Sequence, residues 1–506
     1  MGARVLRKLS ALATESDFSN IMADIQSVIA MAQEEGVEFI DLKFVGLLGD
    51  MQHLTFPVES ALNEDFFIDG VGFDGSSVRG FQTIDKSDMM LVPDASTAII
   101  DPIYDTPTLS VFANIVDPIT REPYSRDPRY IVTKALAYLK STGIGDQVFF
   151  GPEAEFFLFN GVSFGGHKAP GGPDGHFSHY KVESLEGDWN NAGPVYDEMT
   201  QEYNSGHRPR NKGGYVPVPP QDNLVEVRND IVRHLYSAGI GVDLHHHEVA
   251  SGGQCEIGIS LQDIATMCDT MMMHKYIVKN VAAKHGLTAT FMPKPIFGDN
   301  GTGMHCHQSI WKNGQTLMFD ENGYAQLSDL ARYYIGGILK NAPSLLAFTN
   351  ASTNSYHRLV PGYEAPIYLL YSQRNRSAAV RIPLYSKSPK AKRIEFRTPD
   401  VTGNIYLSLV AQLMAGIDGI INKIEPGDPF DKDLYELEPE ERHGIPTVPG
   451  SLEETLDNLE KNHEFLTQGG VFTEDLIEKY IELKRGDVDA IRLRPHPHEF
   501  SLYFDC

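Results

Sequence analysis

Cysteine, tryptophan and long apolar runs are scarce in this sequence of 506 residues. Four cysteines with no Cys-x-x-Cys pair exclude a disulfide framework and indicate a reducing compartment. No run of 18 apolar residues occurs, and the best candidate, 408–421, contains Gln412 and Asp418. We therefore expect a cytoplasmic protein that does not associate with a membrane.

Basic residues are also few, because 43 Lys and Arg face 68 Asp and Glu and give a net charge of −25. Such a charge repels nucleic acid and anionic membranes, so neither is an expected partner. A composition of 42% hydrophobic and 22% charged residues excludes a disordered chain. The first sixteen residues are basic and weakly resemble a transit peptide; a disordered or helical start is the interpretation we favour.

Hydrophobic periodicity predicts a small mixed sheet with one helix, followed by a larger part that mixes strands with long helices. The first helix is predicted over 17–35, and the first strands over 38–44 and 52–56. The segment 161–175 is rich in glycine and is predicted to be a loop. Further helices are predicted over 129–140, 263–285, 329–341 and 404–423.

Two acidic residues interrupt an aromatic strand. Glu153 and Glu155 lie in a run of Phe, Val and Leu, and period-2 alternation places both carboxylates on one face, about 6–7 Å apart. Burying two acids is costly unless something neutralises them, so the pattern favours a cation site over a solvent-facing edge.

A second group lies in His245-His-His-Glu248 and Glu256, around a Ser-Gly-Gly turn. A hairpin centred on Gly252 is predicted to pair Glu248 with Glu256, and a divalent cation between them relieves the repulsion. Alternate histidines face opposite sides, so one or two of the three are expected to be structural.

Two further motifs point to an anionic ligand. A glycine-rich loop starts at Gly298 and leads to His305 and His307, which share a strand face and indicate a nucleotide or metal site. Clustered arginines surround Glu395 and suit bidentate recognition of carboxylate or phosphate, with surface salt bridges as the alternative. These arginines are Arg376, Arg381, Arg393 and Arg397.

Metal-binding carboxylates, a glycine loop and an arginine cluster together suit phosphoryl transfer from a nucleotide. The Walker A and kinase His-Arg-Asp motifs are absent from the sequence, so the predicted ATP site has another design.

The same segments closely resemble bacterial type I glutamine synthetase, in family order from about Val37 to the carboxy terminus. The matching strings start at Phe73 (FDGSS), Glu153 (EAE), Lys212 (KGGYVPVPP), His245 (HHHEVA), Asn300 (NGTGMHCH), Asn354 (NSYHRLVPGYE), Asn375 (NRS) and Arg393 (RIEFR).

The resemblance implies an α+β protein with a small β-grasp-like domain at 37–125, after an extension and first helix at 1–36. A catalytic domain with a curved antiparallel sheet is implied at 126–506. It further implies a homo-oligomer, a dodecamer of two hexameric rings with active sites between neighbouring subunits. The implied reaction joins ammonia to L-glutamate through γ-glutamyl phosphate and converts ATP to ADP and phosphate.

The resemblance also implies a role for each matching residue. Mg²⁺ or Mn²⁺, at least two ions per site, would be held by Glu155, Glu248 and Glu256 and by Glu153, His305 and Glu395. Glutamate would meet Asn300, Gly301, Arg358, Glu364, Arg376 and Arg397, and ATP would meet Asp243, His307, Ser309, Arg381 and Lys390. Catalysis would involve Asp74, which binds ammonium and takes its proton, Glu364, which closes the site to water, and Arg376.

Some positions depart from the family pattern. Asp243 replaces a common Glu, Leu261 replaces an aromatic residue near adenine, and the start is about two dozen residues longer. Tyr435 lies in a segment similar to the adenylylated one, but with Glu438-Pro439 in place of Pro-Pro. A γ-glutamyl-amine (polyamine) ligase and an inactive structural relative are the alternatives; Asp74 and all six metal ligands argue against them.

Overall fold

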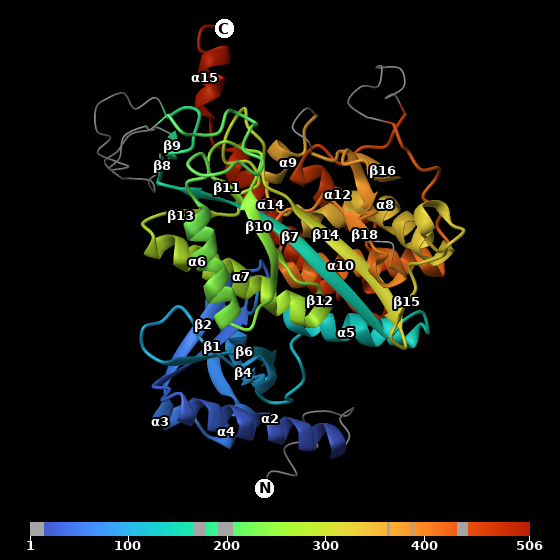
Figure 1. Ribbon diagram of the computed structural model, residues 1–506. Coiled ribbons are helices and arrows are strands. Elements are labelled where there is room, and N and C mark those ends of the chain that lie inside the picture. The colour runs from blue at the N-terminus through green and yellow to red at the C-terminus, as the bar shows by residue number, and fades with distance from the viewer. Residues whose placement is uncertain (1–14, 166–178, 191–205, 362–364, 386–387, 433–443) are drawn as a thin grey trace.

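The computed structural model describes residues 15–165, 179–190, 206–361, 365–385, 388–432 and 444–506 (Figure 1). Within them, the chain forms a small amino-terminal part and a larger part that follows it. The small part, in blue, lies below the larger one in Figure 1. The predicted α+β class is confirmed, because each part combines a sheet with packed helices.

The small part is built on a mixed sheet in the order β2-β1-β6-β4-β3, with β5 paired to β6. Strand β1 pairs antiparallel with β2 and parallel with β6, which confirms the predicted mixed sheet and its first two strands. The first predicted helix is α2. The bounds are α2 Glu15–Glu34, β1 Phe39–Val45, β2 Met51–Pro57, β3 Val71–Asp74, β4 Asp88–Pro93, β5 Ile99–Ile100 and β6 Thr108–Val116.

The larger part contains a sheet in the order β10-β11-β7-β14-β18-β17-β16. Strand β7 is the predicted aromatic strand, and it pairs antiparallel with β11 on one side and β14 on the other. The bounds are β7 Gln147–Phe159, β10 Val242–His247, β11 Gln254–Ile259, β12 Gln262–Asp263, β13 Thr288–Thr290, β14 Met304–Lys312, β15 Gln315–Thr316, β16 Tyr368–Gln373, β17 Ala378–Ile382 and β18 Ile394–Phe396.

The prediction of a loop over 161–175 is wrong for its first five residues. Gly161–Gly165 form strand β8, which pairs antiparallel with β9, His179–Glu183. The pattern misled because Phe164 and Val162 are both exposed, so β8 has no buried face to produce a clear alternation. The remainder, 166–175, lies outside the described residues.

Long helices pack beside the larger sheet, and α10 lies behind β7 and β14 in Figure 1. Helices α8 and α10 approach very closely: a Cβ on Gly337 would lie 2.0 Å from the Ala415 carbonyl oxygen and 2.7 Å from the Gly419 Cα. Helix α8 runs eight residues beyond its predicted end at 341. The bounds are α5 Pro128–Ser141, α6 Val225–Ser237, α7 Ile264–Lys284, α8 Asp329–Thr349, α9 Ser355–Arg358, α10 Ile405–Ile421, α12 Leu452–Lys461, α14 Glu474–Arg492 and α15 Pro497–Tyr503.

The apolar helix α10 is a core element. Its side chains are buried over almost its whole length, including the polar Gln412. Among the described residues, none of the helices is long and apolar enough to cross a bilayer. The methionines of α7 at 267 and 271–273 are buried, as the sequence predicted for a core face.

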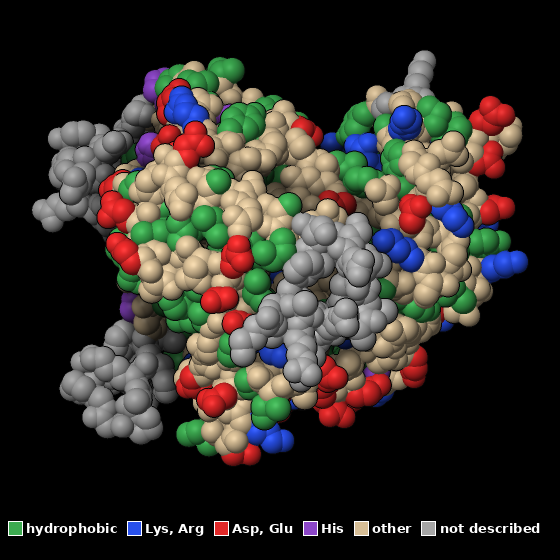
Figure 2. Space-filling model, turned by 90° about the horizontal axis from the view of Figure 1, so that it is seen from below, with side chains coloured by type: hydrophobic (Ala, Val, Ile, Leu, Met, Phe, Trp, Pro, Cys, Tyr) green, Lys and Arg blue, Asp and Glu red, His purple; other side chains and the backbone are tan. Residues whose placement is uncertain are grey.

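Acidic side chains are spread over the surface. On the face shown in Figure 2 they lie among hydrophobic and other side chains and are not gathered in a single patch. The surface acids on this face thus differ from the few buried acids beside β7, which lie close together.

Candidate active site

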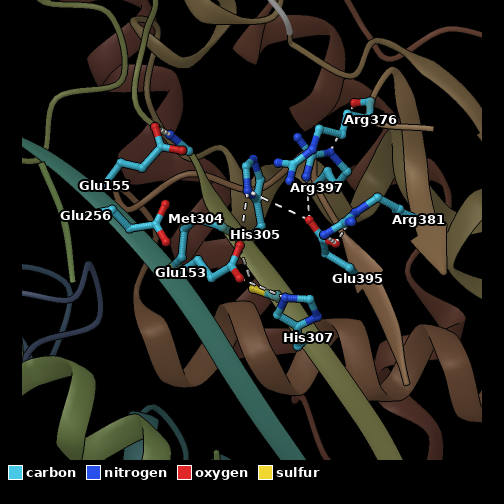
Figure 3. Close-up of polar contacts among 12 residues, drawn as sticks. Glu153, Glu155, Glu256, Met304, His305, His307, Arg376, Arg381, Glu395 and Arg397 are labelled. Atoms are coloured by element: carbon cyan, nitrogen blue, oxygen red, sulfur yellow. Dashed lines mark hydrogen bonds and ion pairs between the residues drawn. The ribbon is translucent and has the colours of Figure 1, made fainter. Parts of the chain in front are cut away.

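Strand β7 positions the predicted carboxylate pair between two neighbouring strands. Glu153 lies opposite His305 of β14, and Glu155 lies opposite Glu256 of β11. Because Glu153 and Glu155 are two residues apart, both side chains face the same side of the sheet. Three strands thus bring their polar side chains to one face (Figure 3).

The hairpin of β10 and β11 has a different register from the predicted one. Glu256 pairs with His246, and the Glu248 N–H donates to the Gln254 carbonyl at 2.8 Å, so Glu248 does not lie opposite Glu256. The pairing of 246 with 256 centres the turn on Ser251, one residue earlier than predicted. Gly253, at the end of the turn, adopts φ +88, and a Cβ there would lie 2.6 Å from the Leu158 carbonyl oxygen. The error is two residues, an even number, so Glu248 and Glu256 still share a face.

The first cluster comprises His246, Glu248 and Glu256, each with a ligand atom within 4.8 Å of the others. Burial and the nearby carboxylates, Glu153 first among them, raise the pKa of Glu256 well above its ordinary range. Burial and Glu248 likewise raise the pKa of Glu155. The cluster therefore holds more negative charge than its protein partners neutralise, and its oxygen-rich donor set fits a hard divalent cation.

The three consecutive histidines have different partners. His245 accepts from the Arg228 guanidinium at 3.2 Å, and His247 contacts Glu186 at 2.9 Å and the Glu248 carbonyl at 2.6 Å. These two are the structural histidines that the sequence predicted. His246 belongs to the acidic cluster, and nothing in the sequence distinguished it from its neighbours.

The second cluster comprises Glu153, His307 and Glu395, again with ligand atoms within 4.8 Å. His305 lies beside it, with its Nδ1 at 3.5 Å from Glu153 and 3.9 Å from Glu395. Burial opposes ionisation of Glu153, but hydrogen bonds to the two histidines outweigh it and hold its pKa well below the ordinary range. Burial and Arg397 lower the pKa of His305, which favours the neutral imidazole that a metal requires.

The proton position on His307 follows from its partners. The Arg393 Nε–H donates to His307 Nδ1 at 3.1 Å, and a guanidinium can only donate. The single proton of the neutral ring is therefore on Nε2, which donates to Glu153 at 2.9 Å. In this tautomer the Nε2 lone pair is not free for a metal, so His305 suits the ligand role better than His307 does.

Glu395 lies between Arg381 and Arg397, as Figure 3 shows. Arg381 and Arg397 each form an ion pair with this fully buried carboxylate. Burial opposes ionisation of Glu395, but the surrounding Arg397 and histidines outweigh it and lower its pKa. Tyr385, which sequence reasoning missed, accepts from Arg376 at 3.2 Å and from Arg381 at 3.0 Å.

A third region lies beside Glu155. The Gly303 N–H donates to Glu155 at 2.9 Å, and the buried Arg358 donates to the Thr398 carbonyl at 2.7 Å and to the Arg397 carbonyl at 3.3 Å. The buried side-chain oxygen of Asn300 has no hydrogen-bond partner among the described residues. Arg358 lies against Gly301 and Gly303 of the loop that contains Asn300. An unpaired acceptor and a buried guanidinium are groups that suit an amino-acid ligand.

The residues predicted to contact the nucleotide lie on several separate elements and do not form one cluster. Ser309 shares a face of β14 with the two histidines, and Asp243 accepts from the Ser260 hydroxyl at 2.5 Å near the start of β10. Leu261 is 49% exposed and lies beside Gly151 of β7. Lys390 is exposed, in the short helical turn Pro389–Ala391.

Asp74 lies in the small part of the chain and not on the strands that carry the two clusters. Asp74 is exposed at the end of β3 in the small part, where it accepts from the Ser76 and Ser77 hydroxyls at 2.6 Å. The hydrogen bond from Ser76 contributes most, that from Ser77 adds to it, and together they lower the pKa of Asp74 and favour its ionised form. Glu364 and Tyr435 lie outside the described residues.

Comparisons with known proteins match almost the whole chain to a single family. Family descriptions match residues 36–118 as "Glutamine synthetase, beta-Grasp domain" and residues 125–503 as "Glutamine synthetase, catalytic domain". A glutamine synthetase of Mycobacterium bovis is 54% identical over 479 residues, covering 94% of this chain and 98% of that protein. One of Streptomyces coelicolor is 55% identical over 483 residues, covering 95% and 98%.

Solved structures are also similar. The cryo-EM structure of Plasmodium falciparum glutamine synthetase superposes with a TM-score of 0.85 at 30% identity, covering 95% of this chain and 98% of that one. A GmaS complex with ADP gives a TM-score of 0.76 at 27% identity, covering 95% and 99%.

Proposed function

The chain belongs to the glutamine synthetase family, and on that premise we propose how its residues perform the reaction. The protein is a glutamate–ammonia ligase that makes glutamine in an ATP-dependent reaction and uses a divalent metal. The residue roles, the identity of the metal, the acyl-phosphate route and the assembly are our proposals.

Two metal positions are assigned. Each overlaps one of the two acidic clusters, with Glu155 in place of His246 in the first and His305 in place of His307 in the second. Glu155, Glu248 and Glu256 hold the ion nearer glutamate, and Glu153, His305 and Glu395 hold the ion nearer the ATP phosphates. The observation that carries this proposal is the excess of buried carboxylate around Glu256, whose raised pKa reflects uncompensated charge. Oxygen-rich sites with one imidazole suit Mg²⁺ or Mn²⁺, which when bound neutralise phosphate charge.

Glutamate is bound by Asn300, Gly301, Arg358 and Arg397. The buried guanidinium of Arg358 pairs with a carboxylate of the substrate, and the free oxygen of Asn300 accepts from its ammonium group. This arrangement orients the γ-carboxylate toward the γ-phosphorus of ATP, where a new O–P bond forms as ADP leaves. Arg376 and Arg381 neutralise charge on the transferring phosphoryl group.

Ammonia then attacks the acyl carbon of γ-glutamyl phosphate and phosphate leaves. Asp74, ionised and exposed, binds ammonium and takes a proton from it, which frees the nitrogen lone pair. Glu364 closes the site to water, which would otherwise hydrolyse the acyl phosphate. His307, Ser309, Asp243 and Lys390 contact ATP.

The position of Asp74 supports an active site shared between subunits. It lies at the end of β3 in the sheet of the small part, whereas both clusters lie on strands of the larger sheet, which favours its supply by a neighbouring copy. We therefore propose a homo-oligomer, a dodecamer of two hexameric rings. A cytoplasmic location and adenylylation of Tyr435 complete the proposal, the former supported by the unpaired state of the four cysteines.

One assay tests the function. Purified protein with ATP, glutamate and Mg²⁺ or Mn²⁺ is expected to release phosphate when ammonium is added. Phosphate release with a polyamine but not with ammonium would show instead the γ-glutamyl-amine ligase, and no release with either would indicate an inactive relative. Analytical ultracentrifugation of the same sample reports the assembly.

A further inference from the structure

A buried carboxylate lies directly before the proposed glutamate-binding residues. Asp299 is fully buried, and its carboxylate accepts hydrogen bonds from both backbone and side-chain donors. Its Oδ1 accepts from the Asn300 N–H at 2.9 Å and from the Lys212 N–H at 3.2 Å. Its Oδ2 accepts from the Ser251 N–H and from the Ser251 hydroxyl, both at 2.7 Å. Four hydrogen bonds therefore satisfy the two oxygens of one buried side chain.

These donors come from three separate segments. Ser251 lies in the turn of the β10–β11 hairpin, which carries Glu248 and Glu256 on its two arms. Lys212 lies in the segment before α6, and Asn300 lies in the loop that leads into β14. Asp299 thus connects the loop that holds glutamate to the hairpin that holds the metal.

A second side chain makes a parallel connection. The Gln254 amide donates to the Glu155 carboxylate at 2.9 Å and to the Gly301 carbonyl at 3.0 Å, and its oxygen accepts from the Ala250 N–H at 2.9 Å. The same loop and the same hairpin are therefore held together at two points, on either side of Asn300. Asp299 accepts two hydrogen bonds from Ser251 of the hairpin, whereas Gln254 donates one to the Gly301 carbonyl of the loop, so the Asp299 connection is the more extensive.

We propose that Asp299 is a positioning residue that sets the glutamate loop against the metal-binding hairpin. This inference rests on the proposed function, because the ligand of Asn300 and Gly301 is taken to be glutamate. Asp299 touches neither substrate nor metal and acts through the backbone of Asn300 and through Ser251. Its loss misplaces the loop relative to the hairpin, and glutamate binding weakens while ATP binding, on the β14 side, is retained.

The test is the kinetics of Asp299→Asn in the assembled full-length enzyme with Mg²⁺. The amide keeps the shape but presents an NH₂ group to donors, so at least one hydrogen bond is lost. We expect the KM for glutamate to rise at least tenfold and the KM for ATP to change less than threefold. The matched control is Asp127→Asn, because Asp127 is also a buried carboxylate that accepts backbone N–H groups, but at the start of α5.

Ser251→Ala keeps the test decisive if Asp299→Asn does not fold. It removes one of the four hydrogen bonds, and we expect a two- to fourfold rise in the KM for glutamate alone. Ser408→Ala is its control, since the buried Ser408 hydroxyl has no partner among the described residues. Equal changes in both KM values, or an unchanged KM for glutamate in Asp299→Asn, would overturn the inference. An inactive wild-type enzyme would instead refute the proposed function.

Discussion

Removing the charge of Glu256 is expected to stabilise the metal-free protein while abolishing activity. Glu256→Gln keeps the size of the side chain and removes one of several buried carboxylates that face each other. Ligand atoms of Glu248 and Glu256 lie within 4.8 Å of one another, and two unit charges at that distance repel by about 3 kcal/mol at an effective dielectric constant of about 20. The gain in unfolding free energy is therefore expected to be about 1–3 kcal/mol at pH 7.5, because part of the repulsion is relieved by protonation.

The pH dependence has a definite sign. Since the pKa of Glu256 is raised in the folded state, the folded protein holds a proton that the unfolded chain has lost. Metal-free wild type must lose stability as the pH rises above the ordinary glutamate pKa of about 4.5 and through the raised one. The Gln variant lacks this loss, so the difference between the two proteins should grow from pH 5 to pH 8.

The assay is thermal unfolding in a chelator and in Mg²⁺ at a fixed protein concentration. Wild type should gain stability with the metal, by about 2.7 kcal/mol when the ion is at 100 times its Kd, and the variant should gain little. Glu482→Gln is the control, because Glu482 is 66% exposed in a surface pair with Lys479. The reasoning fails if the variant is less stable than wild type in the chelator, or if both respond equally to Mg²⁺.

Three further outcomes are expected. Asp74→Ala should reduce ammonium use at least 100-fold and leave ATP binding, measured by calorimetry, within about threefold; equal loss of both would contradict its role. Glu186→Gln should cost about 2 kcal/mol, because the buried His247 loses its charged partner. Burial opposes the charge on His247, but Glu186 outweighs burial and raises the pKa of His247, so wild type loses stability as the pH rises above about 6.5. If the Gln variant had the same pH profile of denaturation as wild type, this coupling would be refuted. Gly337→Ala should lower stability by about 3 kcal/mol in chemical denaturation, because its Cβ meets the backbone of α10, and a change below 0.5 kcal/mol would exclude that packing.

Local elements with a buried face were predictable from the sequence. Strand β7 and helix α7 confirm their predictions because period-2 and helical spacing follow directly from which side chains are buried. Strand β8 was missed because it is exposed on both faces and its partner β9 follows only after a long segment. The continuation of α8 through Pro343 was missed for the opposite reason, since burial against α10 outweighs the local preference to end the helix.

The register of the metal-binding hairpin could not be predicted from the sequence, for a different reason. The Ser-Gly-Gly signal located a turn, but the pairing of Glu256 with His246 on one side and with Glu155 on the other defines which residues form it. The roles of His245, His246 and His247 were likewise undetermined, because they depend on Arg228 and Glu186, which lie elsewhere in the chain.

The sequence alone determined which residue types are present and which of them share a strand face. The alternation of Glu153 with Glu155, and of His305 with His307, is a consequence of backbone geometry and needs no tertiary information. Only the tertiary structure decided which faces meet. The proton of His307 is placed by Arg393, and Asp299 joins the glutamate loop to the hairpin, because hydrogen bonds form between atoms that are close in space whatever their separation in the chain.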